Sequence, residues 1–99
     1  MDQFAILALL QARPGKEKEV EEFLKSAQPL AQQEAETTTW YAVKLGPSRY
    51  GIFDTFSTEG GRSAHLNGEI AKLLFARAEE LFAVSPQVEM LEILAAKSI

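Results

Sequence analysis

Residues 37–56 read TTTWYAVKLGPSRYGIFDTF, and they give the clearest indication of the fold. Its two halves are rich in β-branched and aromatic residues, which are typical of strands. The turn at Gly46-Pro47-Ser48 is short, so strands over residues 37–43 and 50–56 are expected to pair as an antiparallel hairpin. The hairpin also carries a dense aromatic group, which suits either core packing or stacking on a planar ligand: Trp40, Tyr41, Tyr50, Phe53 and Phe56.

Before the hairpin, the pattern predicts a strand followed by a helix. Residues 4–12 (FAILALLQA) form an apolar run that stops at Arg13-Pro14-Gly15, which favours a strand over the alternative of a short core helix. Pro29 lies inside the helix that follows and should kink it or end its first part. The apolar residues of that helix recur at the spacing of a single stripe: Val20, Phe23, Leu24, Ala27, Leu30 and Ala31.

After the hairpin we expect two helices and a last strand. Ser57 or Thr58 can cap a short helix over residues 59–66, which Asn67-Gly68 should break or bend. A longer helix is predicted from about Glu69 to Ala83, and a strand from Val88 to Ala95. The order β-α-β-β-α-β over one domain, residues 1–99, predicts an α+β, ferredoxin-like protomer: a four-stranded antiparallel sheet with both helices on one face.

The outer strands carry apolar residues on both of their faces. In the first strand Ala5, Leu7 and Leu9 alternate with an equally apolar set, and the last strand repeats the pattern. Two helices cover one face only, and soluble monomers avoid a large bare apolar face. We therefore expect a homodimer in which two sheets pack together; a monomer with a few tolerated surface apolar residues is the alternative.

Composition excludes several classes of protein. The net charge of −4, from 10 basic and 14 acidic residues, disfavours nucleic acid as a partner. The chain has no cysteine and one histidine, which excludes thiolate chemistry and a multi-histidine metal site within one chain. Residues 4–10 are too short an apolar run to span a membrane and follow Asp2 rather than a basic segment, so we expect a cytoplasmic protein.

His65 and Asp54 are the candidate catalytic residues. His65 is the one side chain whose ordinary pKa lies near neutrality, and it precedes a helix break, although a surface or packing role is the alternative. Asp54 lies in an apolar strand, where a buried carboxylate needs a partner. That partner is either His65, which would make a general base with an orienting group, or a backbone amide, Arg49 or Arg62. No glycine-rich phosphate loop is present, and nothing in the sequence specifies a cofactor.

Four segments covering nearly the whole chain resemble the antibiotic biosynthesis monooxygenase (ABM) superfamily, in particular its quinol monooxygenase-like subgroup. They are ARPGKEKEVEEFL (12–24), WYAVKLGPSRYGIFDTF (40–56), AHLNGEIAKLL (64–74) and VEMLEILAAK (88–97). The resemblance implies a ferredoxin-like protomer that pairs into a dimeric α/β barrel, with one pocket per protomer between the sheet and the helices. It also implies, for some members, oxidation of phenols or quinols by molecular oxygen without flavin, metal or haem, and for others haem degradation.

Individual positions refine what the resemblance implies. His65 matches the family's helix histidine, which binds haem in the haem-degrading branch. Phe56 stands where that branch and the polyketide-oxidising branch carry tryptophan, and Ala8 falls near the haem branch's asparagine. Ile52 replaces a polar amide of the polyketide branch. Haem degradation is therefore the third hypothesis.

The leading hypothesis is a cofactor-independent monooxygenase for a small aromatic phenol or quinol. In it, His65 deprotonates the hydroxyl, Asp54 orients His65, and the substrate-binding residues are Trp40, Tyr50, Ile52 and Phe56. The alternative is a non-catalytic dimeric module that binds a small hydrophobic ligand, since a fold does not determine a function.

Overall fold

The computed structural model describes residues 2–98 and has the α+β element order that the sequence predicts. Four strands and four helices follow one another along these residues: β1 (Phe4–Gln11), α1 (Glu17–Gln33), β2 (Thr37–Lys44), β3 (Arg49–Phe56), α2 (Glu59–Leu66), α3 (Glu69–Ala76), α4 (Ala78–Leu81) and β4 (Gln87–Glu92). Where the sequence leaves a choice of cap for α2, the structure selects Thr58, whose hydroxyl accepts a hydrogen bond from the Gly61 amide at 3.0 Å.

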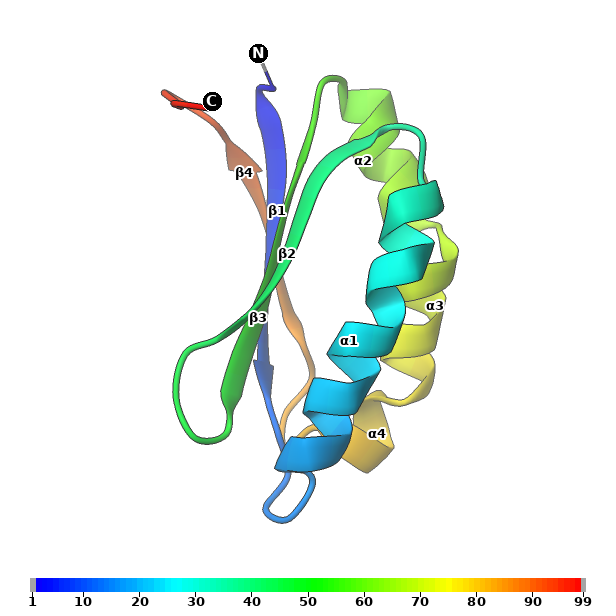
Figure 1. Ribbon diagram of the computed structural model, residues 1–99, viewed down its shortest axis with the longest axis vertical. Coiled ribbons are helices and arrows are strands. Elements are labelled where there is room, and N and C mark those ends of the chain that lie inside the picture. Colours follow the sequence, from blue (N-terminus) through cyan, green and yellow to red (C-terminus); the bar gives the residue numbers. More distant parts are fainter. Residues whose placement is uncertain (1, 99) are drawn as a thin grey trace.

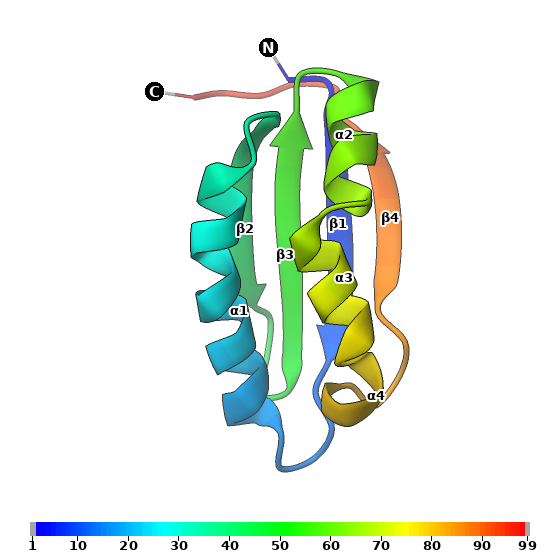
Figure 2. The ribbon, with the colours of Figure 1, turned by 90° about the vertical axis from the view of Figure 1, so that its right-hand side faces the viewer.

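The strands form one antiparallel sheet in the order β2-β3-β1-β4, so the first strand of the chain lies inside the sheet. All the helices cover the same face of this sheet, and the opposite face is bare (Figure 1). Figure 2 shows α1 lying over β2 and α2 over β1, with β3 visible between these helices and β4 at the edge of the sheet. The predicted ferredoxin-like fold is thereby confirmed.

The core lies between the sheet and the helices. The predicted stripe of α1 supplies five of its buried side chains, and the helix continues through Pro29 as far as Gln33. From the sheet, alternation turns Ile6, Ala8 and Leu10 toward the helices. The largest cluster joins residues of β1, α1, β3, α3 and α4 with two residues that follow β1 and α4: Ala8, Leu10, Ala12, Val20, Phe23, Leu24, Tyr50, Ile52, Leu74, Leu81 and Phe82.

Two boundaries differ from the sequence-based prediction. The single helix expected over residues 69–83 is wrong: α3 ends at Ala76, and the short α4 is followed by Phe82, which turns into an extended conformation, bridges to Ala12 and becomes buried. The last strand ends at Glu92 rather than Ala95, because its partner β1 begins opposite it, at Phe4. Leu94, expected on a strand face, is instead 88 % exposed.

The bare face of the sheet, which we call the open face, is largely apolar. Leu7, Leu9 and Phe53 lie on it half-buried, and the side chains of Tyr41 and Val43 on the edge strand β2 are exposed. This distribution agrees with the two-faced apolar pattern of β1. Within residues 2–98, no helix combines the length and the hydropathy needed to cross a membrane.

The Thr58 cap gives a first testable prediction, because it holds the beginning of the helix that carries His65. Loss of a side-chain cap costs about 1 kcal/mol of stability. We expect Thr58→Ala to lower the free energy of unfolding in urea by about that amount, and Thr58→Ser to retain most of it. Ser57→Ala, one residue earlier and exposed, is the matched control; an equal loss there would contradict the assignment of the cap.

Candidate functional site

Three side chains from three elements form one chain of hydrogen bonds centred on His65. The Nδ1 atom of His65, in the last turn of α2, lies 2.6 Å from Oε1 of Glu34. Its Nε2 atom lies 2.9 Å from Oδ2 of Asp54 on β3. The contact between His65 and Asp54 that the sequence suggested is therefore present, and the alternative partners Arg49 and Arg62 are not used by Asp54. Glu34 was not anticipated.

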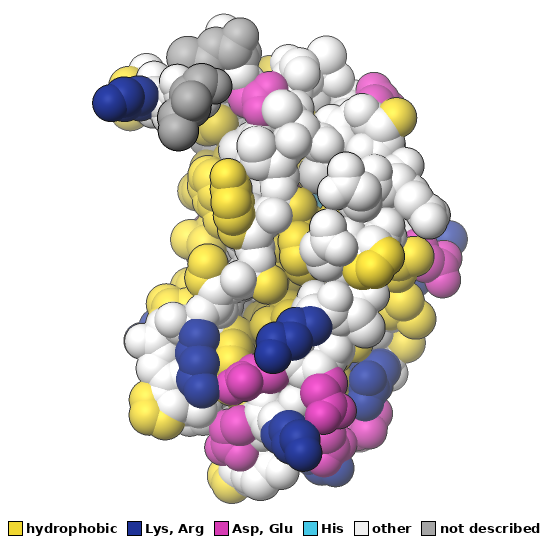
Figure 3. Space-filling model, in the orientation of Figure 1, with side chains coloured by type: hydrophobic (Ala, Val, Ile, Leu, Met, Phe, Trp, Pro, Cys, Tyr) yellow, Lys and Arg dark blue, Asp and Glu magenta, His cyan; other side chains and the backbone are white. Residues whose placement is uncertain are grey.

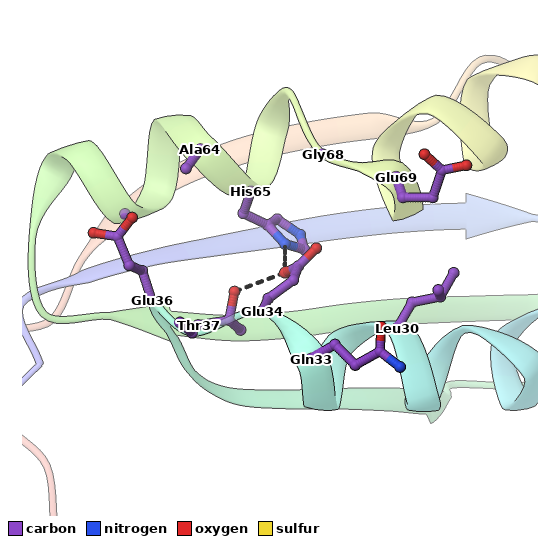
Figure 4. Close-up of a pocket in the computed structure, with 11 residues that line it drawn as sticks. Leu30, Gln33, Glu34, Glu36, Thr37, Ala64, His65, Gly68 and Glu69 are labelled. Atoms are coloured by element: carbon purple, nitrogen blue, oxygen red, sulfur yellow. Dashed lines mark hydrogen bonds and ion pairs between the residues drawn. The ribbon is translucent and has the colours of Figure 1, made fainter.

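The strand, helix and turn that hold these groups follow from local rules. Alternation along β3 turns Asp54 toward the helices, between Ile52 and Phe56. Glu34 follows the end of α1, and the hydroxyl of Thr37 donates to its Oε1 at 2.7 Å. Figure 4 shows the imidazole pointing at the Glu34 carboxylate, which also accepts the bond from Thr37.

Two glycines let α2 approach the turn that carries Glu34. A Cβ atom at Gly68 would lie 3.3 Å from Oε2 of Glu34 and 3.2 Å from the carbonyl oxygen of His65. A Cβ atom at Gly61 would lie 3.1 Å from the Cβ atom of Glu36. Both distances are tighter than ordinary contacts, so a larger residue at either position would push the helix and its histidine away from Glu34.

The surroundings of His65 favour its protonated form. Burial opposes a charge on the ring and lowers its pKa, but the hydrogen bonds to Asp54 and Glu34, together with the attraction of both carboxylates, outweigh burial and raise the pKa above 6.5. Only the imidazolium donates from both nitrogens, so it alone satisfies both carboxylates. The Phe56 ring packs beside the imidazole, with its centroid 5.4 Å away.

A cavity of about 310 Å³ opens on the Glu34 side of this chain. Glu34 and His65 both line it, whereas Asp54 lies beneath His65, is 1 % exposed and does not line it. The other lining residues come from the end of α1, the following turn, α2 and the start of α3: Leu30, Gln33, Ala35, Glu36, Thr37, Gly61, Ala64, Gly68 and Glu69. A ligand in this cavity would meet the Glu34 carboxylate.

Two predicted substrate-binding residues, Trp40 and Tyr50, line a different hollow. It has a volume of about 410 Å³ and lies between α1 and β2; we call it the α1–β2 groove. Figure 3 shows hydrophobic atoms inside it and charged side chains at its lower end. Tyr50 donates to Oε2 of Glu21 at 2.6 Å, and burial together with this bond raises the pKa of Tyr50 to about 12.

The remaining two predicted residues, Ile52 and Phe56, are packed in the core. The predicted set is thus divided, with His65 beside one cavity, Trp40 and Tyr50 beside the other, and Asp54 buried. Sequence reasoning missed Glu34 because no spacing relates it to His65. The available signal was its place in an acidic turn between a helix and a strand. Among residues 2–98, no cluster of acidic or histidine side chains suits a metal ion.

The chain is similar in sequence and structure to the NE2512 protein of unknown function from Nitrosomonas europaea. The two are 48 % identical over 100 % of this chain and 96 % of the other, with a TM-score of 0.96. The chain belongs to the family of the NE2512 protein. No family model matches the chain, and no curated protein does.

The fold of this family is shared by more distant solved structures. One from Nitrosomonas europaea, named a "putative antibiotic biosynthesis monooxygenase", is 11 % identical and covers 93 % of this chain and 99 % of its own, with a TM-score of 0.83. Another so named, from Deinococcus radiodurans, is 15 % identical over 97 % of both chains, with a TM-score of 0.82. The resemblance to antibiotic biosynthesis monooxygenases is confirmed at the level of the fold.

The raised pKa of His65 predicts how stability changes with pH. Below about pH 6.5 the ring is protonated in the folded and the unfolded chain, and the stabilisation by its two carboxylates is complete. As the pH rises through the folded pKa, this contribution is lost. We expect the free energy of unfolding in urea to fall with pH above about 6.5, and His65→Gln to remove that slope.

NMR provides the control, because the chain has a single histidine and its ring resonances need no assignment. Glu34→Gln should lower the titration midpoint of His65, since the variant loses one charged acceptor. Glu36→Gln, an exposed carboxylate that lines the same cavity, should change it little. A midpoint below 6.5 in the unmodified chain would show that burial outweighs the carboxylates.

Proposed function

We propose that this chain is a cofactor-independent monooxygenase that oxidises a small aromatic phenol or quinol with molecular oxygen. The observation that carries the proposal is the hydrogen-bonded chain Glu34–His65–Asp54, which links a solvent-facing cavity to the interior of the sheet. In this chain a proton accepted by one carboxylate can pass through the imidazole to the other, so the three groups can act together as an acid–base relay. The names of the structures with the same fold support an oxygenase over other proton-transfer enzymes.

We propose that a carboxylate, rather than His65, accepts the proton in the first step. In the sequence-based hypothesis His65 itself takes the hydroxyl proton, but both of its ring nitrogens are bonded to carboxylates. A phenol has a pKa of about 10. A nearby positive charge stabilises the phenolate and lowers this pKa, and a carboxylate can then accept the proton. His65 then supplies that charge and connects the two carboxylates, while the phenolate gains the electron density needed to react with oxygen.

The overall reaction balances with the phenol as the only reductant. For a phenol with hydrogen on its para carbon, one atom of O₂ becomes the second carbonyl oxygen of a quinone. The other atom leaves as water, with the hydroxyl hydrogen and the para hydrogen. The substrate loses four electrons and O₂ gains four, so a flavin, a haem or a metal is not required by the balance. Trp40, Tyr50, Ile52 and Phe56 are proposed to surround the ring.

Oxygen uptake and quinone formation test this proposal. The purified, metal-free protein is incubated with a panel of phenols and hydroquinones, in air and anaerobically. We expect quinone to form only in air and faster than in buffer, and His65→Gln or Glu34→Gln to reduce the rate about a hundredfold or more, as loss of acid–base catalysis does. Glu22→Gln, on the solvated face of α1, is the control.

A non-catalytic module that binds a small hydrophobic ligand is the second candidate. It is favoured by the mutual bonding of His65 and Asp54, which satisfies His65 without a substrate, and by the apolar interior of the α1–β2 groove. The two candidates differ in one outcome of the experiment above. Binding of the phenols without quinone formation in air would favour the module, and it would contradict the monooxygenase for those substrates.

We also propose that a second copy of the chain covers the open face. Tyr41 and Val43 are exposed there beside the half-buried Leu7, Leu9 and Phe53, and an apolar face of this kind is self-complementary under two-fold symmetry. A partner sheet would bury it and close the barrel that the family resemblance implies. No metal, nucleic acid or membrane is needed as a partner in this arrangement.

Sedimentation at low micromolar concentration tests the dimer. We expect about twice the mass of one chain, which is 10.9 kDa. The double variant Tyr41→Lys, Val43→Lys should sediment as a single chain, because both side chains are exposed in the protomer and the new charges would be buried only in the dimer. Met90→Lys, exposed on the helix-covered side of the sheet, should stay dimeric. A single-chain mass for the unmodified protein would contradict the proposal.

A further inference from the structure

Two buried polar atoms have no hydrogen-bond partner within residues 2–98: Nε1 of Trp40 and Oδ1 of Asp54. The indole nitrogen is a donor, and the carboxylate oxygen is an acceptor. Leaving a buried polar atom unpaired costs about 1–3 kcal/mol, and more for a charged group. Such atoms in a folded protein call for an explanation, and two of complementary type call for a common one.

The two atoms belong to residues that lie directly opposite each other. Trp40 on β2 pairs with Asp54 on β3 in the ladder, and both side chains point toward the helices. Side chains opposed in this way have Cβ atoms about 5 Å apart. Trp40 and Asp54 nevertheless do not bond to each other, so a donor and an acceptor on neighbouring strands are both left without a partner under the helices.

The apolar neighbours of Trp40 favour a hydroxyl group on an apolar ring over a water molecule as the partner of these two atoms. Trp40 packs against the apolar cluster of Ala27, Ala31 and Ile70, which offers no side-chain hydrogen bonds. A buried water typically makes about three hydrogen bonds and would find fewer beside that cluster. A phenolic hydroxyl needs one donor and one acceptor, and its ring gains from apolar neighbours.

We propose that Trp40 and Asp54 form the hydroxyl subsite of this protein. The ligand hydroxyl donates to Oδ1 of Asp54 and accepts from Nε1 of Trp40, while Oδ2 of Asp54 keeps its bond to His65. Trp40 also lines the α1–β2 groove, so the ligand reaches the subsite from that groove when the indole moves aside. This assignment rests on the proposed function and deepens it. The substrate is a phenol that is recognised through hydrogen bonds to its hydroxyl group, and Asp54 is the carboxylate that accepts its proton.

A binding experiment with two matched probes tests the subsite without requiring turnover. The probes are p-cresol and 4-methylanisole, which differ by methylation of the oxygen. The para carbon of p-cresol is blocked, so the quinone route described above is closed to it. The chain has a single tryptophan, so its indole N–H resonance in a ¹⁵N–¹H spectrum reports Nε1 directly. The His65 ring resonances serve as a second reporter.

We expect p-cresol to move the indole N–H resonance downfield and to bind about tenfold to a hundredfold more tightly than 4-methylanisole, the range for a hydrogen bond to a charged group. Trp40→Phe, which keeps a ring without the donor, and Asp54→Asn should each reduce this preference, as followed at His65. Phe75→Leu, an exposed aromatic on α3 outside both cavities described above, should leave it unchanged.

Equal affinity for the two probes, or no change at either reporter, would overturn the subsite. So would a crystal structure grown with p-cresol in which both atoms bind an internal water only. The result is separable from the proposed function. A strong preference for p-cresol without oxygen uptake on any phenol would leave the subsite in place and remove the monooxygenase. Quinone formation without that preference would do the reverse.

Discussion

The carboxyl group of Asp54 lies inside the fold and has to be satisfied from within it. A buried carboxylate without partners is costly, and its partner inside the fold is the imidazole of His65. This requirement fixes where α2 lies along β3, because His65 must reach Asp54. Glu34 then holds the other side of the ring, and Gly61 and Gly68 leave room for its turn. The core, the connection between α1 and β2 and the cavity beside it are all arranged around that one pair.

The same pair explains why the polar and apolar parts of the candidate site are separate. His65 and Glu34 face a cavity rimmed by further carboxylates, whereas Trp40 and Tyr50 of the hairpin face the α1–β2 groove. Asp54 lies between the two and is bonded on one oxygen only. A proton taken up by Asp54 would therefore have a hydrogen-bonded route through the imidazole to the carboxylate of Glu34, which lines the solvent-facing cavity. An apolar ring in the groove would not need to share that cavity with water.

Much of this fold is predictable from periodicity, because the apolar stripe of α1 and the alternation of β1 and β3 are set by burial against one core. The pairing of Asp54 with His65 is also predictable, since a carboxylate in an apolar strand needs a partner and the chain has one histidine. Glu34 is not, because its contact depends on the tertiary position of a turn. The end of α4 at Leu81 has the same origin: Phe82 is buried and bridges to Ala12, which outweighs the helical preference of residues 82–83. The separation of His65 from Trp40 and Tyr50, which line different hollows, depends on tertiary packing that no local pattern encodes.

The position of β1 inside the sheet has a consequence for biosynthesis. The ribosome makes β1 first, but its two neighbours come later: Leu10 pairs with Tyr50, and Ala8 pairs with Val88. Until then both edges of the apolar strand β1 are unpaired and can pair with unrelated chains. The sheet is complete only once β4 has left the exit tunnel. Long separations of this kind slow folding. In this protein the central strand therefore waits for nearly the whole chain before both of its edges are paired.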